Sequence, residues 1–238
     1  MNDRSPLTES EFDGFADEYR AQHAANIALS GESPDFFAEY KVADIAATLA
    51  ARGRSGAGLR ILDFGAGIGN SVPYFHKHLP GARITCLDVS GKCLALGEAR
   101  FPGLAEFVLF DGRQLPFPDG TFDVILCACV LHHIDPAEHA TVLAGLHRLL
   151  SERGQLFVFE HNPWNPLTVR AVNTCPFDVN ARLISAPALA ATLRRAGYGG
   201  VERRFRIFFP GLLRRLRPLE RWLRWCPAGA QYCLMARR

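Results

Sequence analysis

The sequence lacks the features that would place the chain in a membrane or outside the cell. No apolar run reaches the roughly 18 residues of a membrane-spanning helix. The first twenty residues are polar and acidic, unlike the basic and then apolar start of a secretory signal peptide. The seven cysteines form no CxxC pair, and several lie in apolar runs, as small buried core residues do. These absences predict a cytoplasmic protein with neither a disulfide framework nor a metal site.

An internal repeat and a low-complexity linker are also absent, so the 238 residues are expected to form one domain. We divide it into an N-terminal helical cap (1–55), a central core (56–160), and a C-terminal part (161–238). The last part holds a long polar loop, a basic helical insert and the final strands.

Short apolar runs alternate with amphipathic stretches along the chain, and this alternation predicts a doubly wound α/β fold. Strands are expected at 59–64, 83–88, 105–110, 122–127, 155–160, 200–209 and 231–236. Helices are expected at 10–30, 34–51, 70–78, 91–100, 136–150 and 186–196. Asp135 and Pro136 are the predicted N-cap and first residue of the helix at 136–150.

The most informative segment is residues 61–70, which reads ILDFGAGIGN. An apolar strand there ends in a glycine-rich turn that opens a helix, so a ligand can press against main-chain atoms. The spacing is GxGxG, whereas dinucleotide binders have GxGxxG to seat a pyrophosphate on the helix N-terminus. The turn therefore disfavours a dehydrogenase.

Two acids follow at the ends of the next two strands. Asp88 lies nineteen positions beyond Gly69, where a carboxylate can accept both hydroxyls of a ribose. Asp111 follows the third strand and could accept the amino hydrogens of an adenine. Because parallel strands end at one crevice, these features are expected to converge on a single nucleoside.

At these residues the chain resembles the class I methyltransferases that use S-adenosylmethionine (SAM). LDFGAGIG is similar to their first motif, LDVS to the segment with the ribose acid, and FDGRQLPFPDGTFDVILCACVLHHI to the next two. The resemblance covers residues 59–160 and implies a seven-stranded, mostly parallel sheet with an antiparallel last strand. It also implies that Asp63 and Gly65 lie near the methionine amino group, Asp88 on the ribose, Asp111 and Gly112 on the adenine, and Ala128 under the methionyl part. The expected cofactor-binding residues are Asp63, Gly65, Ala66, Gly67, Gly69, Asp88, Val89, Asp111, Gly112 and Ala128.

A sulfonium methyl is already a strong electrophile, so the protein must align the acceptor and in some cases remove a proton. Candidate bases after the fourth and fifth strands are His132, His133, Glu160 and His161, of which His133 and His161 are the predicted catalytic residues. For His132, the favoured interpretation is that it only shapes the pocket through hydrogen bonds. For His133, this role and that of a base are equal alternatives.

The loop after the fifth strand is expected to bind the acceptor, with His161, Asn162 and Asn165 as polar contacts. In the alternative, the two Asn-Pro pairs only form turns. Tyr19 either folds over the cofactor, as in many relatives, or packs in the core.

The C-terminal part is strongly basic: from Arg194 onward it has twelve arginines, no lysine and two acids, in a chain of net charge +3. Leucines at 212, 216, 219 and 223 predict an amphipathic helix over 211–225 that Pro218 must kink or split. Its apolar face either caps the sheet edge or the acceptor pocket, with the arginines solvated, or it meets, together with Phe208 and Phe209, an anionic membrane or a phosphate-bearing, lipid-linked acceptor. Nucleic acid is not an expected partner, because no recognition module is present and CVLHHI differs from the Asn/Asp-Pro-Pro-aromatic motif of nucleobase amino-methylating enzymes.

The sequence thus predicts transfer of a methyl group from SAM to oxygen, nitrogen or carbon of a small metabolite, a glycan or a lipid-linked acceptor. Oxygen is slightly favoured. The alternative is a catalytically silent protein of Rossmann-like fold that binds SAM or a nucleotide.

Overall fold

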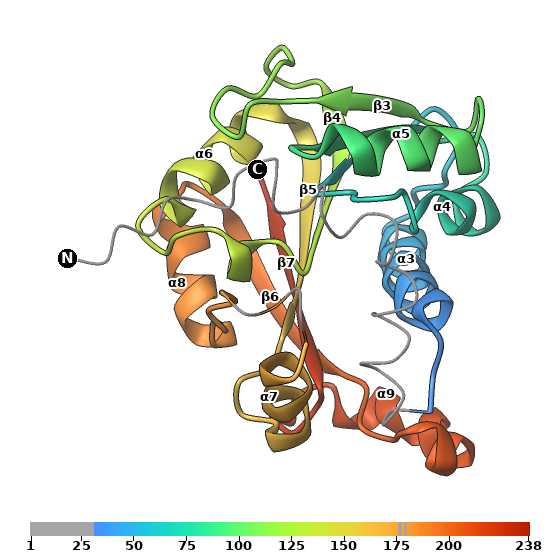
Figure 1. The fold of residues 1–238 in the computed structure, drawn as a ribbon, viewed down its shortest axis with the longest axis vertical. Coiled ribbons are helices and arrows are strands. Elements are labelled where there is room, and N and C mark those ends of the chain that lie inside the picture. The colour runs from blue at the N-terminus through green and yellow to red at the C-terminus, as the bar shows by residue number, and fades with distance from the viewer. Residues whose placement is uncertain (1–30, 176–177, 179) are drawn as a thin grey trace.

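A seven-stranded sheet crosses the molecule in the order β3-β2-β1-β4-β5-β7-β6 (Figure 1). The computed structural model describes residues 31–175, 178 and 180–238. Strands β1 to β5 pair in parallel, whereas β7 is antiparallel to both of its neighbours, β5 and β6. The predicted doubly wound sheet with an antiparallel last strand is confirmed. The strands are β1 (Arg60–Phe64), β2 (Arg83–Asp88), β3 (Glu106–Leu109), β4 (Phe122–Ala128), β5 (Leu150–His161), β6 (Gly199–Arg206) and β7 (Gln231–Arg237).

Helices cover both faces of the sheet and create two apolar cores (Figure 1). Leucines of α6 (His139–Leu149) and α8 (Ala186–Arg195) pack on one face. On the other, Val42, Ile45 and Leu49 of α3 (Pro34–Ala50) pack with Phe75 of α4 (Val72–His78). Helix α5 (Gly91–Arg100) lies beside β2 and β3. Because the central strands are buried on both faces, they are continuous apolar runs without alternation.

Helix α6 is shorter at both ends than the helix expected at 136–150. Asp135 accepts a hydrogen bond from the amide of Ala137 at 2.8 Å and closes a separate turn, so α6 begins only at His139. Leu150 leaves the helix and pairs with Phe122 as the first residue of β5.

The long loop after β5 contains a helix that the sequence reading missed, α7 (Pro166–Asn173). Asn165 is its N-cap: the side chain accepts a hydrogen bond from the amide of Thr168 at 3.0 Å. Pro166 takes the first helical position, which suits a residue without an amide hydrogen.

The basic insert is kinked, but at Leu213 and not at Pro218, which lies inside the helical run. Only the end of the insert is α-helical. Residues Gly211–Leu219 form a 3₁₀ helix, η4, and α9 (Glu220–Leu223) follows it. A second short 3₁₀ helix, η2 (Leu131–His133), follows β4.

The expected helix at 10–30, with Tyr19, lies outside the described residues. Among the described helices, none is long and apolar enough to cross a membrane. All seven cysteines are thiols, and five of them are buried, as expected of small core residues.

Candidate active site

The glycine-rich turn between β1 and α4 has a backbone that other residues would strain. Gly65 and Gly67 have φ of 72° and 51°. A Cβ on Gly65 would lie 2.4 Å from Cγ2 of Val130, so β1 and the segment after β4 could not approach as they do. A Cβ on Gly67 would meet no atom within 4 Å, so this face of the turn is open.

Asp88 ends β2 directly beside this turn. Its Oδ2 accepts a hydrogen bond from the Gly67 amide at 2.7 Å, and its Oδ1 accepts one from the Ser90 amide at 3.0 Å. The side chain is 9% exposed and lines a cavity. The predicted meeting of the first turn with the second strand end is therefore present in the fold.

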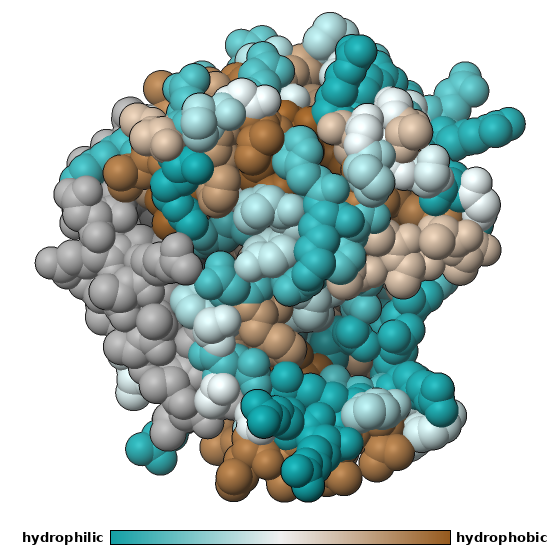
Figure 2. All heavy atoms as spheres, turned by 90° about the vertical axis from the view of Figure 1, so that its right-hand side faces the viewer, coloured by the Kyte–Doolittle hydropathy of each residue, from teal (hydrophilic) through white to brown (hydrophobic). Residues whose placement is uncertain are grey.

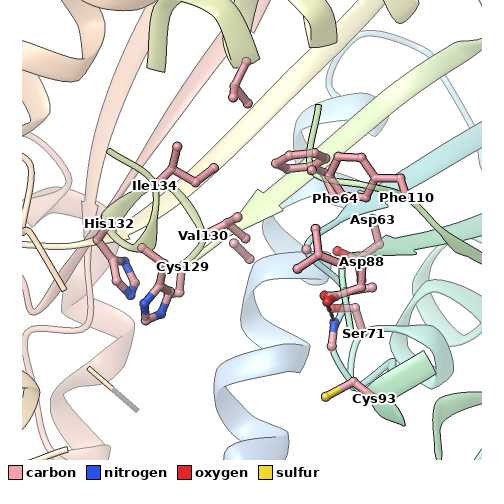
Figure 3. A pocket seen from close by; sticks show the side chains of 18 of the residues that line it. Asp63, Phe64, Ser71, Asp88, Cys93, Phe110, Cys129, Val130, His132 and Ile134 are labelled. Atoms are coloured by element: carbon pink, nitrogen blue, oxygen red, sulfur yellow. Dashed lines mark hydrogen bonds between the residues drawn. The ribbon is translucent and has the colours of Figure 1, made fainter. Parts of the chain in front are cut away.

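Asp63 lies one strand away, near the end of β1, and is 3% exposed. Burial raises the pKa of its carboxyl to about 7; a hydrogen bond with Ser71 opposes the rise, while the charge of Asp88 adds to it. Figure 3 shows Asp63 and Asp88 close together beside Ser71. An acid this poorly solvated favours a bound cation.

These groups open into a cavity of about 710 Å³, which continues from the β1 and β2 ends to the β4 and β5 ends. Figure 3 shows its two sides, with Asp63 and Asp88 on one and His132 and Cys129 on the other. Of the residues that the sequence singled out, it is lined by Asp63, Gly65, Ala66, Gly67, Asp88, Val89, Gly112, Ala128, His132, His133 and His161.

Two of the expected cofactor residues do not line the cavity. Gly69 packs toward Phe107, whose Cε1 would lie 3.2 Å from an added Cβ. Asp111 is exposed, and its Oδ1 accepts hydrogen bonds from the amides of Arg113 and Gln114, each at 2.8 Å. The Asp111 carboxylate thus closes its own turn, and these bonds lower its pKa.

The side of the cavity at the ends of β4 and β5 holds a buried charge cluster. Nδ1 of His132 lies 2.5 Å from Oε2 of Glu160, and Oε1 of Glu160 accepts from the Leu131 amide at 2.9 Å. Oδ1 of Asp178 lies 3.5 Å from Nε2 of both His132 and His133.

The two neighbouring imidazoles carry opposite pKa shifts. Burial opposes protonation of His132, but the charge of Glu160 and the bonds with Asp178 and Glu160 raise its pKa well above the ordinary value. Burial, together with the charge of His132, lowers the pKa of His133 to about 3. His132 is therefore an imidazolium held between two carboxylates, and His133 is neutral at physiological pH. The interpretation of His132 as a hydrogen-bonding group that shapes the pocket suits this arrangement.

The asparagines expected to contact an acceptor bind the backbone instead. Asn162 donates to the carbonyls of Pro227 and Gly229 at 2.8 and 2.7 Å, and Asn165 donates to the carbonyl of Ala228 at 2.8 Å. They tie the start of α7 to the turn before β7. Of the three expected acceptor contacts in this loop, only His161 lines the cavity.

Sequence reasoning missed two cavity residues that carry unusual chemistry. Lys41 of α3 is 8% exposed, and its Nζ lies 3.8 Å from Sγ of Cys129. Burial opposes ionisation of the Cys129 thiol, but Lys41 and His161 lower its pKa to about 7. The sequence did contain a signal for Lys41. It lies four residues after Phe37 and four before Ile45, which puts a cation on the apolar face of the helix, where a functional role is to be expected.

Comparison with known proteins agrees with this geometry. Residues 62–158 match the family model of a methyltransferase domain. The ubiquinone/menaquinone biosynthesis C-methyltransferase UbiE of Ectopseudomonas mendocina is 32% identical over 128 residues, which are 51% of this chain and 49% of that protein. An uncharacterized methyltransferase of Synechocystis is 30% identical over 118 residues, 47% of this chain and 54% of that one. The chain thus spans about half the length of the curated relatives it matches.

Solved structures extend the similarity to the whole fold. A SAM-dependent methyltransferase from Thermotoga maritima has a TM-score of 0.65 at 18% identity, covering 95% of this chain and 97% of that chain. One from Archaeoglobus fulgidus has a TM-score of 0.62 at 16% identity, covering 82% and 93%. With its strand order and its glycine-rich turn, the chain has the class I methyltransferase fold, and its core, residues 62–158, matches the methyltransferase-domain family.

Proposed function

We propose that the protein transfers the methyl group of SAM to a small-molecule or lipid-linked acceptor. The observation that carries the proposal is a single cavity with two chemically different sides. One side has a glycine-rich turn and two buried acids, and the other has a histidine cluster. A cofactor on the first side would present its methyl group to an acceptor held on the second.

The cofactor side fits an adenosyl-sulfonium compound. The open face at Gly67 lets a ligand approach the main chain. Asp88, whose carboxylate lines the cavity beside the glycine-rich turn, would hold the ribose hydroxyls. Asp63 would hold the methionine ammonium, and Gly112 would lie against the adenine. The volume of about 710 Å³ is typical of small-molecule sites. We propose cofactor contacts from Asp63, Gly65, Ala66, Gly67, Asp88, Val89, Gly112 and Ala128.

The bound cofactor supplies an electrophilic methyl group, so the protein mainly aligns the nucleophile and excludes water. For a hydroxyl acceptor, a proton must also leave oxygen as the oxygen–methyl bond forms. His161 and His133, both on the cavity wall, are the groups we propose to take it. The lowered pKa of His133 keeps its imidazole unprotonated but also makes it a weak base. Asp178 would orient His133 and stabilise its protonated form, since its carboxylate faces Nε2 at 3.5 Å.

The acceptor atom is oxygen, nitrogen or carbon. UbiE relatives are named as C-methyltransferases of ubiquinone and menaquinone biosynthesis. Removing the proton of a phenol activates both its oxygen and the adjacent ring carbon, so the same histidines would serve either outcome. We therefore propose an acceptor that has an ionisable hydroxyl on an apolar body.

Calorimetry with SAM and S-adenosylhomocysteine tests the cofactor, and release of S-adenosylhomocysteine with pools of phenolic and lipid-linked acceptors tests the reaction. Binding with turnover supports the proposal. Binding without turnover on any acceptor favours the silent binding protein, and absence of binding to either compound refutes both. Titration with NAD is the matched negative control.

A further inference from the structure

Large exposed apolar side chains gather at one end of the molecule. Of the ten such residues in the described chain, eight fall in two short segments, around the start of α7 and along η4 and α9. Figure 1 shows both segments at the same end of the fold. The eight are Trp164, Leu167, Leu212, Leu213, Leu216, Leu219, Trp222 and Trp225.

An apolar stripe runs along η4 and into α9. Leu216 and Leu219 lie three residues apart in η4, and with three residues per turn their side chains lie above one another. Leu213 precedes them at a kink in η4, and Trp222 follows them in α9. Leu213, Leu216, Leu219 and Trp222 are 44%, 40%, 43% and 57% exposed. The stripe therefore faces outward instead of packing on the sheet.

Exposed positive charge surrounds this stripe. Arg214, Arg215 and Arg221 are exposed, and within the described residues none of them has an ion-pair partner. Arg217 instead pairs with Glu32. The one acid of η4 and α9, Glu220, points inward, where its Oε1 accepts from the Phe208 amide at 2.9 Å. Figure 2 shows apolar and strongly hydrophilic side chains interleaved at this end of the molecule.

The two segments are joined by hydrogen bonds. Asn165 binds the Ala228 carbonyl at 2.8 Å, and Oγ1 of Thr168 donates to the Ala230 carbonyl at 3.0 Å. These bonds tie the first turn of α7 to the chain that follows Trp225. Trp164 and Leu167 are therefore held by the same framework as the apolar stripe and the arginines around it.

We propose that this end of the molecule, formed by residues 164–167 and 211–225, docks on the surface of an anionic lipid bilayer. Tryptophan and leucine insert at the boundary between headgroups and acyl chains, and arginines bind anionic headgroups. A face that combines outward apolar side chains with exposed arginines and no exposed acid in η4 or α9 is complementary to such a surface. The proposal does not depend on the methyltransferase activity.

Docking would also place the cavity beside the bilayer, an inference that rests on the proposed function. Helix α7 exposes Leu167 at the docking end, whereas Ala171 and Val172 on the same helix line the cavity. An acceptor anchored in the lipid would reach the histidine cluster along α7. The lipid-linked class of acceptor follows from this geometry.

Two other occupants are conceivable for the same face. One is a second copy of the chain. The other is the N-terminal segment 1–30, which has six acids, two arginines and several aromatic residues. Both would hide the face from lipid, so the experiment must distinguish them.

The test is flotation of the full chain with phosphatidylcholine vesicles that do or do not contain phosphatidylglycerol. We expect binding only to the anionic vesicles, weakened by high salt. The double variant R214E/R215E should bind at least about tenfold more weakly, since each basic residue near an anionic surface contributes to attraction. The control R194E/R195E changes the net charge equally on exposed α8 positions and should bind like the parent.

A third variant, L216S/W222S, removes apolar area without changing charge and should also lose binding. Calorimetry with SAM on every variant shows whether the cofactor side is intact. Absence of binding of the parent to anionic vesicles at low salt would overturn the proposal. So would binding that appears only after removal of residues 1–30, or a dimer of the parent that L216S/W222S dissociates.

Discussion

Acidification should weaken SAM binding because Asp63 takes up a proton near neutral pH. Burial raises the pKa of this carboxyl to about 7 in the protein without cofactor. If only the carboxylate pairs with the methionine ammonium, apparent affinity scales with the ionised fraction of Asp63. That fraction falls about 25-fold between about pH 7.5 and about pH 5.5, which corresponds to about 2 kcal/mol.

Calorimetry across this range measures the effect directly. The α-amino group has a pKa of about 7.7–8.0, so the ligand stays largely cationic throughout. Binding below pH 7 should release a proton, and the observed enthalpy should therefore vary with the ionisation enthalpy of the buffer. Asp63→Asn is the matched control: it should bind more weakly at pH 7.5 and lose most of the pH dependence.

The same group makes a prediction for the stability of the protein without cofactor. A carboxyl whose folded pKa is raised stabilises the fold most below its ordinary pKa, and this contribution is lost as pH rises through about 7. Asp63→Asn should therefore raise the melting temperature at pH 8 but not at pH 4. A parent protein with constant SAM affinity from pH 5.5 to 7.5, and no proton release, would refute the assignment of Asp63 to the ammonium.

Three further changes probe other parts of the cavity. Asp88→Ala should weaken SAM binding about 10- to 100-fold, because hydrogen bonds to a charged group contribute about 1.5–3 kcal/mol each; unchanged affinity in calorimetry would contradict its ribose role. Alkylation of Cys129 by iodoacetamide, followed by mass spectrometry, should rise with an inflection near pH 7, and Lys41→Met should shift it to higher pH. A parent inflection near 9 would exclude this effect of Lys41. Glu160→Gln should reduce the free energy of unfolding in urea by about 3–5 kcal/mol, because it leaves His132 with one carboxylate fewer. The stabilisation by Glu160 is present above the ordinary glutamate pKa of 4.5 and is lost on acidification, because the folded pKa of Glu160 is lowered. Equal stability of the parent and Glu160→Gln at pH 7 would rule this stabilisation out.

Local sequence pattern was sufficient to predict those parts of the site that follow from the order of strands and helices. Short apolar runs that alternate with helices determine a parallel sheet, and strand ends in such a sheet meet at one edge. Asp63, Gly67 and Asp88 could therefore be brought together from sequence. Asp111 does not line the cavity with them. A short polar side chain can bind the amides two and three residues ahead, and the Asp111 carboxylate forms this local alternative.

The sequence at Asn165 contained a helix-start signal that the prediction assigned to acceptor binding or a turn. The pair Asn165-Pro166 has the same form as Asp135-Pro136, yet only Asn165-Pro166 begins a helix. The two sites differ in tertiary context: Asn165 also binds the Ala228 carbonyl, which holds the cap in place, whereas the chain after Asp135 turns again before α6.

The sequence by itself determined the fold class, the glycine-rich turn, the place of Asp88 at the second strand end and the excess of arginine near the C-terminus, because each depends on neighbours within a few residues or on a regular period. Only the tertiary structure decided that His133 meets Asp178, that Lys41 reaches Cys129, and that the leucines of η4 face outward. These contacts join segments far apart in the chain or depend on a 3₁₀ rather than an α period, and the free energies that select them arise from packing and burial, which no local pattern contains.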